Sequence, residues 1–181
     1  MSARVGGSGR AALLSILVLS VADCGSTSSR PGGYYKDDGP GSRSAQEMDR
    51  IPDAKPRREA LHRYANRPYE VNGKHYVPYT SLREYRKRGT ASWYGTRFHG
   101  KPTSSGERYD MYAMTAAHPI LPIPSYARVT NVANGKSVVV RINDRGPFHD
   151  ARLIDLSYAA AHRLGYVQAG SAQVEVESLI P

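Results

Sequence analysis

Two β-prone segments joined by Asn134-Gly135 constrain the fold of this chain more than any other feature. Residues 126–133 and 136–142 are rich in Val, Ile and Thr, and the second segment is almost continuously apolar. Asn-Gly is the dipeptide that two-residue β-hairpin turns prefer, and such a turn would pair Val129 with Val140. An almost continuously apolar strand is typical of burial on both faces or of a barrel wall. The pattern therefore predicts a long hairpin within a β domain.

Strand signals on both sides of this hairpin extend the β domain over residues 89–181. Ser157 is placed to cap a helix over residues 158–164, and Gly165 is placed to end it. Residues 111–117 fit a strand or a helix by pattern alone. Roughly six short strands with one helix favour a closed barrel, because a closed barrel has no exposed edges. Further strands are expected at residues 90–94, 151–156 and 173–180.

Residues 1–24 carry the features of an export signal. Arg4 and Arg10 precede a run of Ala, Leu, Ile, Val and Ser over residues 11–22, which is too short to span a bilayer. Cys24 follows closely and is the only cysteine in the chain, so no intramolecular disulfide is expected. The pattern resembles a bacterial lipoprotein signal, in which Cys24 is acylated and becomes the new N-terminus. The alternative is an ordinary export signal with an incidental cysteine.

Residues 25–55 are rich in Ser, Gly, Pro and charged residues, with too little apolar surface to offset the entropy lost on folding. We expect a flexible tether there. Residues 1–88 hold 16 basic and 9 acidic groups (net +7), whereas residues 89–181 hold 9 and 7 (net +2). The overall charge of +9 therefore belongs mainly to the region before the β domain. Solvated linker charge is preferred over contact with an anionic lipid or wall polymer.

Residues 56–88 form an intermediate segment with a second hairpin signal. Asn72-Gly73 lies between two short β-prone runs, and Pro68 and Pro78 bracket them. The prolines restrict this hairpin to an edge or satellite position, so we expect it to pack against the main domain. The basic run over residues 83–88 indicates a solvated connector. It does not indicate a nucleic-acid site, because an exported protein rarely meets nucleic acid.

Three motifs in the β domain are specific when taken together. They are Gly89-Thr-Ala-Ser-Trp-Tyr-Gly95, Thr103-Ser-Ser-Gly-Glu-Arg-Tyr109 and Val140-Arg-Ile-Asn-Asp-Arg-Gly-Pro-Phe148, accompanied by His118-Pro119 and by Arg152-Leu-Ile-Asp-Leu-Ser157. With this ordered set the chain resembles the rare lipoprotein A family, whose members are septal lytic transglycosylases of the bacterial envelope. The resemblance covers residues 89–178 and extends to the hairpin at 68–80. It implies a mainly β fold with a six-stranded double-psi β-barrel.

The resemblance also implies an activity, the endolytic cleavage of peptidoglycan glycan strands between N-acetylmuramic acid and N-acetylglucosamine. The product carries a 1,6-anhydro end, no water is consumed, and strands that lack stem peptides are preferred. By position, the catalytic pair of the family falls on Glu107 and Asp144, with His118 as a third functional residue. Many family members carry a C-terminal glycan-binding domain of the SPOR type. Because the sequence ends at Pro181, we expect no such domain in this chain.

The residues themselves fit this chemistry. Glycosidic cleavage needs an acid for the leaving oxygen and stabilisation of an oxocarbenium-like transition state, and two carboxylates in different environments supply both. We assign Asp144 as general acid and then base, and Glu107 as the stabilising carboxylate, although the sequence leaves the two roles interchangeable. The non-catalytic alternatives are an ion pair with a neighbouring arginine for Asp144, a solvated loop carboxylate for Glu107 and a packed, hydrogen-bonded histidine for His118.

Aromatic residues near these positions predict a sugar-binding groove, because aromatic rings stack on the C–H faces of sugars. Trp93 is expected in the core, and Asp155 is expected to have a structural role. The candidate substrate-binding residues are Tyr94, Tyr109, Arg145 and Phe148.

No cofactor is expected. His99, His149 and His162 show no ligand spacing with Cys or carboxylates, so no metal site is predicted. Residues 95–100 lack the pattern of a phosphate-binding loop.

The expected location is the bacterial cell envelope, on the periplasmic side. We expect a lipid anchor in the outer membrane, because Gly25 is not the Asp that favours retention in the inner membrane. Two alternatives to an enzyme remain open: a non-catalytic, expansin-like glycan-binding module, and a scaffold lipoprotein that recruits cell-division proteins. The presence of both carboxylates favours the enzyme.

Overall fold

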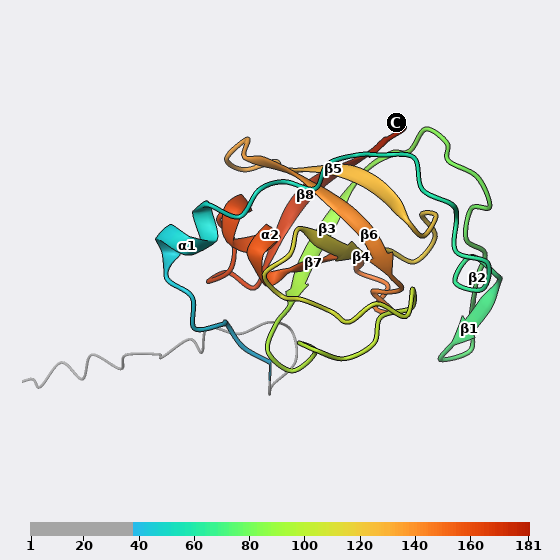
Figure 1. The fold of residues 1–181 in the computed structure, drawn as a ribbon, viewed down its shortest axis with the longest axis horizontal. Helices are drawn as coiled ribbons and strands as arrows, with labels where there is room; N and C mark the ends of the chain where they lie inside the picture. The colour runs from blue at the N-terminus through green and yellow to red at the C-terminus, as the bar shows by residue number, and fades with distance from the viewer. Residues whose placement is uncertain (1–37) are drawn as a thin grey trace, which may run out of the picture.

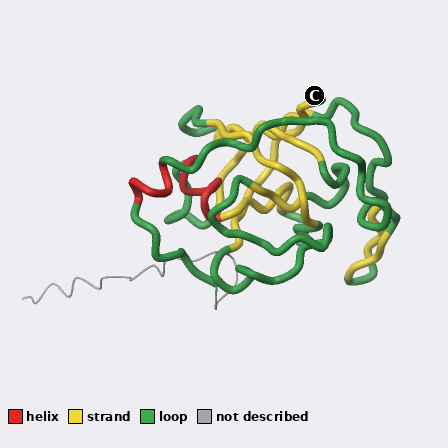
Figure 2. The backbone as a smooth tube through the Cα atoms, in the orientation of Figure 1, coloured by secondary structure: helices red, strands yellow, loops and turns green. Residues whose placement is uncertain are grey.

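The computed structural model describes residues 38–181 and contains a closed barrel of six strands in the order β3-β7-β4-β6-β5-β8 (Figure 1). Each strand bonds to two neighbours, so the predicted closed barrel of a mainly β chain is confirmed. Loops make up most of the remainder (Figure 2). No helix in residues 38–181 is long and apolar enough to cross a membrane. The elements are α1 (Ala45–Asp49), β1 (Tyr69–Val71), β2 (Lys74–Tyr76), β3 (Arg86–Tyr94), β4 (Thr115–Ala117), β5 (Ser125–Asn131), β6 (Ser137–Asp144), β7 (Arg152–Ser157), α2 (Tyr158–Leu164) and β8 (Ser171–Leu179).

Inward-facing apolar side chains fill the barrel. In β6, the buried Val138, Val140 and Ile142 alternate with partly exposed residues, which is the pattern of a barrel wall. Val176 of β8 faces the same core. Trp93 lies in this core with 1% of its surface exposed, where the sequence places it.

The central hairpin from β5 to β6 has a different turn from the one expected. Val129 pairs with Val138 and not with Val140, so the predicted register is wrong by two residues. The connection is longer than two residues, and the Asn134 side chain donates to Leu164 O (3.0 Å) at the C-terminal end of α2. This tertiary contact outweighs the local preference of Asn-Gly for a tight turn.

Helix α2 is bounded as the sequence predicts and packs against β3, β6 and β7. Ser157 Oγ accepts a hydrogen bond from Ala160 N (3.2 Å). Gly165 takes a left-handed φ of 77° and ends the helix.

The satellite hairpin of β1 and β2 also forms as predicted. Asn72 and Gly73 both have positive φ values (51° and 74°), which is the conformation of a tight hairpin turn. Tyr69 and Tyr76 stack on each other (ring centroids 5.0 Å apart), and each makes a T-shaped contact with Phe148. The hairpin therefore packs beside the residues that follow β6.

Residues 38–60, here named the N-terminal strap, include α1 and then run along the barrel towards the satellite hairpin (Figure 1). Met48 is completely buried against the core. The Asp53 carboxylate accepts from Val139 N on β6 (3.1 Å). The predicted flexible tether is therefore wrong for residues 38–55, because a few apolar side chains and backbone hydrogen bonds suffice to hold a polar segment on a preformed barrel.

The strap begins against the end of β3. The Asp38 carboxylate accepts from Gly95 N (2.8 Å) and Arg97 N (3.0 Å), and Gly39 O accepts from Thr96 N (3.1 Å). A Cβ on Gly95 would lie 2.1 Å from Gly39 O, so only glycine permits this approach.

β3 begins earlier than the sequence suggests. The sequence predicts a solvated connector over residues 83–88, but residues 86–88 of this run pair with β8. Glu175 of β8 bonds to Arg86 (2.7 Å) and Arg88 (2.8 Å). Pairing of opposite charges across neighbouring strands stabilises a basic run that alone favours solvation.

Candidate active site

The turn of residues 103–107, here named the catalytic turn, lies at the end of β6. Gly106 in this turn has a left-handed φ of 81°. Ser105 N donates to Asn143 O (3.3 Å), which ties the turn to the strand. The turn therefore brings Glu107 and Asp144, the two predicted catalytic carboxylates, to the same end of β6.

The Asp144 carboxylate is fixed by hydrogen bonds to one of its oxygens. Ser104 donates from N (2.8 Å) and Oγ (2.7 Å), and Arg145 donates from N (2.7 Å), all to Asp144 Oδ1. Asp144 also lines a pocket of about 130 Å³, here named the mouth pocket, together with Tyr94, Phe148 and Asp155.

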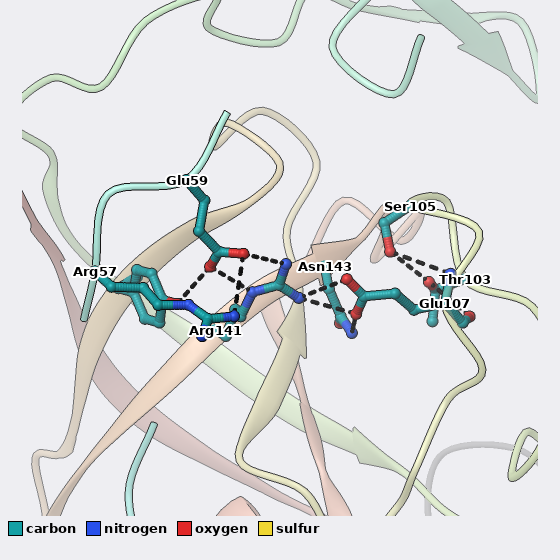
Figure 3. Close-up of polar contacts among 8 residues, drawn as sticks. Arg57, Glu59, Thr103, Ser105, Glu107, Arg141 and Asn143 are labelled. Carbon is teal, nitrogen blue, oxygen red and sulfur yellow. Dashed lines mark hydrogen bonds and ion pairs between the residues drawn. The ribbon is translucent and has the colours of Figure 1, made fainter. Parts of the chain in front are cut away.

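The Glu107 carboxylate is held by two side chains of β6. Arg141 Nη1 donates to both oxygens (2.8 and 2.9 Å), and Asn143 Nδ2 donates to Oε2 (2.9 Å; Figure 3). The Glu107 side chain nevertheless keeps 45% of its surface exposed. Glu107 is therefore an oriented, accessible carboxylate rather than a freely solvated one.

Arg145, a predicted substrate-binding residue, turns its guanidinium into the protein. It donates to Ala65 O (3.0 Å), His118 O (3.0 Å), Leu121 O (2.6 Å) and Asn66 Oδ1 (2.8 Å). Burial lowers the pKa of Arg145 to about 10. The structure thus gives this guanidinium a bracing role beneath the site and no ion pair with Asp144. Arg145 also lines the mouth pocket, so its contact with a sugar stays a prediction.

His118 also lies inside the protein, with 1% of its surface exposed. Its Nδ1 faces the N–H groups of Ile120 (3.2 Å) and Leu121 (3.0 Å), and its Nε2 bonds to Tyr85 Oη (3.0 Å). Because Nδ1 accepts, the proton is assigned to Nε2 of a neutral ring. Burial, with nearby cationic side chains, lowers the pKa of His118 to about 3. This geometry matches the packed, hydrogen-bonded alternative and supports a positioning role.

The predicted aromatic residues form two layers at the mouth pocket. Phe148 stands at the rim with 36% of its surface exposed, and Tyr94 lines the pocket. Tyr109 is only 2% exposed, stacks on Tyr94 (ring centroids 4.0 Å apart) and donates from Oη to Tyr94 O (2.5 Å). Tyr109 therefore supports Tyr94 from inside the protein. Burial, then Asp144 and Asp155, raise the pKa of Tyr94 well above its ordinary value, so its hydroxyl stays protonated.

Asp155, to which the sequence assigns a structural role, lines the mouth pocket beside Asp144. Ala117 of β4 pairs with Asp144 on one side and with Asp155 on the other, so the two carboxylates flank one residue and line the same pocket. Burial raises the pKa of Asp155 to about 6, with Arg152 opposing and Asp144 adding to the shift. In the sequence, the signal for Asp155 is its position in Arg152-Leu-Ile-Asp-Leu-Ser157, the last segment of the ordered set.

Further residues that hold the carboxylates were not singled out from the sequence. Ser104, Arg141 and Asn143 all lie within the motifs, but a motif does not state which atoms its side chains reach. Glu59 also contacts Arg141, and it lies in a segment without any motif.

Within residues 38–181, no group of three or more His, Cys, Asp or Glu side chains is arranged to hold a metal ion. Cys24, the predicted lipidation site, lies outside the described residues, as does the rest of the predicted export signal.

Comparison with known proteins adds a family to this geometry. A family model described as lytic transglycolase matches residues 86–176. The chain is 60% identical over 129 residues to a Neisseria meningitidis protein and 58% identical over 135 residues to a Pseudomonas aeruginosa protein, both named endolytic peptidoglycan transglycosylase RlpA. These matches cover 71% and 75% of this chain but 54% and 39% of the relatives. The chain thus spans about half the length, or less, of these two relatives.

A Vibrio cholerae protein of the same name is 51% identical over 163 residues, which are 90% of this chain and 60% of that protein. Among solved structures, Streptomyces papain inhibitor gives a TM-score of 0.42 at 20% identity and covers 53% of this chain and 96% of that one. Apo expansin from Clavibacter michiganensis gives a TM-score of 0.40 at 19% identity, with 53% and 51% covered.

The region that the family model matches includes nearly all of the barrel, the catalytic turn and both carboxylates. The chain therefore belongs to the lytic transglycosylase family with a double-psi β-barrel domain, which includes the RlpA proteins.

Proposed function

We propose that this protein is an endolytic peptidoglycan lytic transglycosylase that cleaves the β-1,4 bond between N-acetylmuramic acid and N-acetylglucosamine. The observation that carries the proposal is the catalytic turn, which holds Glu107 and Asp144 at one end of β6 next to an open pocket. Two carboxylates in different surroundings are what glycosidic cleavage requires. The names of the relatives support the same activity.

Asp144 acts first as the acid and then as the base. Its proton passes to the glycosidic oxygen while the bond from that oxygen to C1 of N-acetylmuramic acid breaks. The resulting carboxylate then takes the proton of the C6 hydroxyl as O6 bonds to C1. The proton is thereby returned to Asp144, the product ends in a 1,6-anhydro sugar, and no water is consumed. The donors on Oδ1 hold the carboxyl so that Oδ2 exchanges the proton.

Glu107 stabilises the positive charge that develops at C1 and the ring oxygen in the transition state. Its carboxylate is oriented before the substrate arrives, because Arg141 and Asn143 fix both oxygens. A preoriented charge needs no reorganisation during the reaction.

The glycan strand lies across the catalytic turn. On the Asp144 side, Phe148 and Tyr94 border the mouth pocket. On the Arg141 side, a larger hollow of about 610 Å³ opens between the N-terminal strap and the residues that lead into β4, with Tyr112, Tyr126 and several aliphatic side chains in its lining. Hollows on both sides of the reacting carboxylates suit an enzyme that cuts within a chain.

The function is tested by digestion of purified glycan strands that lack stem peptides. We expect products with 1,6-anhydro ends by mass spectrometry, and slower release from strands that retain their peptides. Hydrolysed reducing ends would indicate a hydrolase instead, and binding without cleavage would indicate an expansin-like binding module. Either outcome contradicts the proposal.

We also propose that the protein works in the cell envelope, anchored to the outer membrane through a lipid on Cys24. The support is the uncharged run over residues 11–22, which ends two residues before this single cysteine. Replacing Cys24 by Ser should move the protein from the membrane fraction to the soluble periplasmic fraction. Unchanged membrane association of Cys24→Ser would contradict the anchor.

A further inference from the structure

The guanidinium of Arg141 is shared between two carboxylates (Figure 3). Nη1 bonds to Glu107, whereas Nε and Nη2 bond to Glu59 Oε1 (2.9 Å) and Oε2 (3.0 Å). The side chains of Arg141 and Glu59 are each only 18% exposed, in contrast to the accessible Glu107. Arg141 and Glu59 thus form a mostly buried ion pair, and Arg141 also binds the more exposed carboxylate of Glu107.

Glu59 is itself firmly placed. Its carboxylate accepts a hydrogen bond from Tyr126 and lies 3.6 Å from the Arg57 guanidinium. The bond from Arg141, followed by that from Tyr126, lowers the pKa of Glu59 to about 2 against the effect of burial, so Glu59 is charged across the neutral range. For Arg141, burial lowers the pKa, but the bonds to Glu59 and Glu107 outweigh it and leave the pKa raised.

The backbone of the N-terminal strap keeps Glu59 in register with β6. Ala54 N donates to Val139 O (3.0 Å), and the Asp53 carboxylate accepts from Val139 N (3.1 Å), two residues before Arg141 on the same strand. These hydrogen bonds between the strap and β6 therefore place Glu59 beside Arg141.

From this arrangement we propose that Glu59 is a positioning residue for the reaction, which acts through Arg141 on Glu107. A long arginine side chain bound only to an exposed carboxylate samples many rotamers, because an exposed ion pair is weak. Contacts on both Nε and Nη2 remove that freedom and leave Nη1 aimed at Glu107. The inference rests on the proposed function and extends the site to a residue outside positions 86–176, which the family model matches.

The test is the Glu59→Gln variant of the full chain, assayed on peptide-free glycan strands. Because Glu107 works on the transition state, we expect kcat to fall about tenfold while KM changes less than twofold. Glu175→Gln is the matched control, since Glu175 also binds two arginines, Arg86 and Arg88, but on β8. Its kcat should equal that of the wild type. Equal kcat for Glu59→Gln and the wild type would overturn the proposal.

A double-mutant cycle separates positioning from a general structural effect. In the Glu107→Gln background, Glu59→Gln should cause no further loss of single-turnover rate, because the residue on which it acts is already missing. A further tenfold loss would show that Glu59 acts elsewhere and would contradict the proposal. Circular dichroism confirms folding, and if Glu59→Gln does not fold, the shorter but charged Glu59→Asp is used in the same cycle. A wild type without anhydro products would refute the proposed function instead, and is distinguishable from both results.

Discussion

Replacing Asp144 by Asn should reduce the rate of 1,6-anhydro product formation by about 1,000-fold, the effect of removing a general acid and base. The amide cannot give a proton to the glycosidic oxygen or take one from the C6 hydroxyl. Its oxygen still accepts from Ser104 and from Arg145 N, so the catalytic turn should keep its place. The measurement is product release from peptide-free strands by mass spectrometry, with kcat and KM determined separately.

Asp49→Asn is the control for this variant, because Asp49 is an exposed carboxylate that pairs with His162 far from the catalytic turn in the sequence. It should behave as the wild type. Full activity of Asp144→Asn would refute the acid role. The next candidate would then be Asp155, which faces the same pocket and has a pKa of about 6.

Replacing His118 by Ala should destabilise the protein by about 3 kcal/mol at pH 7, because two buried N–H groups lose their acceptor. Those groups belong to Ile120 and Leu121, and Tyr85 loses a partner as well. His118→Asn should lose only about 1 kcal/mol, since an Asn side chain accepts from the same backbone positions in an Asx turn. Urea unfolding measures both variants. A His118→Ala protein that is fully stable but inactive would show that His118 takes part in the chemistry.

The same histidine predicts a pH dependence. Its pKa is depressed from 6.5 to about 3 in the folded protein, so the stability that the neutral ring contributes is complete above pH 6.5 and is lost progressively as the pH falls from 6.5 towards 3. Between pH 7 and pH 4.5 the wild type should therefore lose about 2–3 kcal/mol more than His118→Asn, whose side chain does not titrate. Parallel losses in the two proteins would contradict the assigned neutral ring.

The two Asn-Gly dipeptides show how far local sequence reasoning reaches. Asn72-Gly73 forms the predicted tight turn, because little besides its own strands acts on it. Asn134-Gly135 does not, because the Asn134 side chain is drawn to the end of α2. Two residues are enough to predict a preferred type of turn, but they do not predict a hydrogen bond to the carbonyl of Leu164, which is distant in the sequence.

The residues of the site likewise fall into those that motifs predict and those that only the folded structure brings together. Glu107 and Asp144 were found because they lie in ordered motifs, and the structure brings them to one strand end. The bonds that the Arg145 guanidinium makes to backbone carbonyls could not be predicted, because a motif gives the position of a side chain but not its direction. Glu59 carried no signal, since its partner Arg141 is far away in the sequence and only folding places them together.

Gly95 belongs to the motif that helps to identify the barrel, yet its lack of a side chain serves a segment far upstream. The carbonyl oxygen of Gly39 occupies the space that a Cβ on Gly95 would need. The barrel sequence thus has a glycine at position 95 because the backbone of the strap occupies the space of a side chain there. A unit that folds as this domain should accordingly include Asp38 and Gly39 and not start at the first residue of β3.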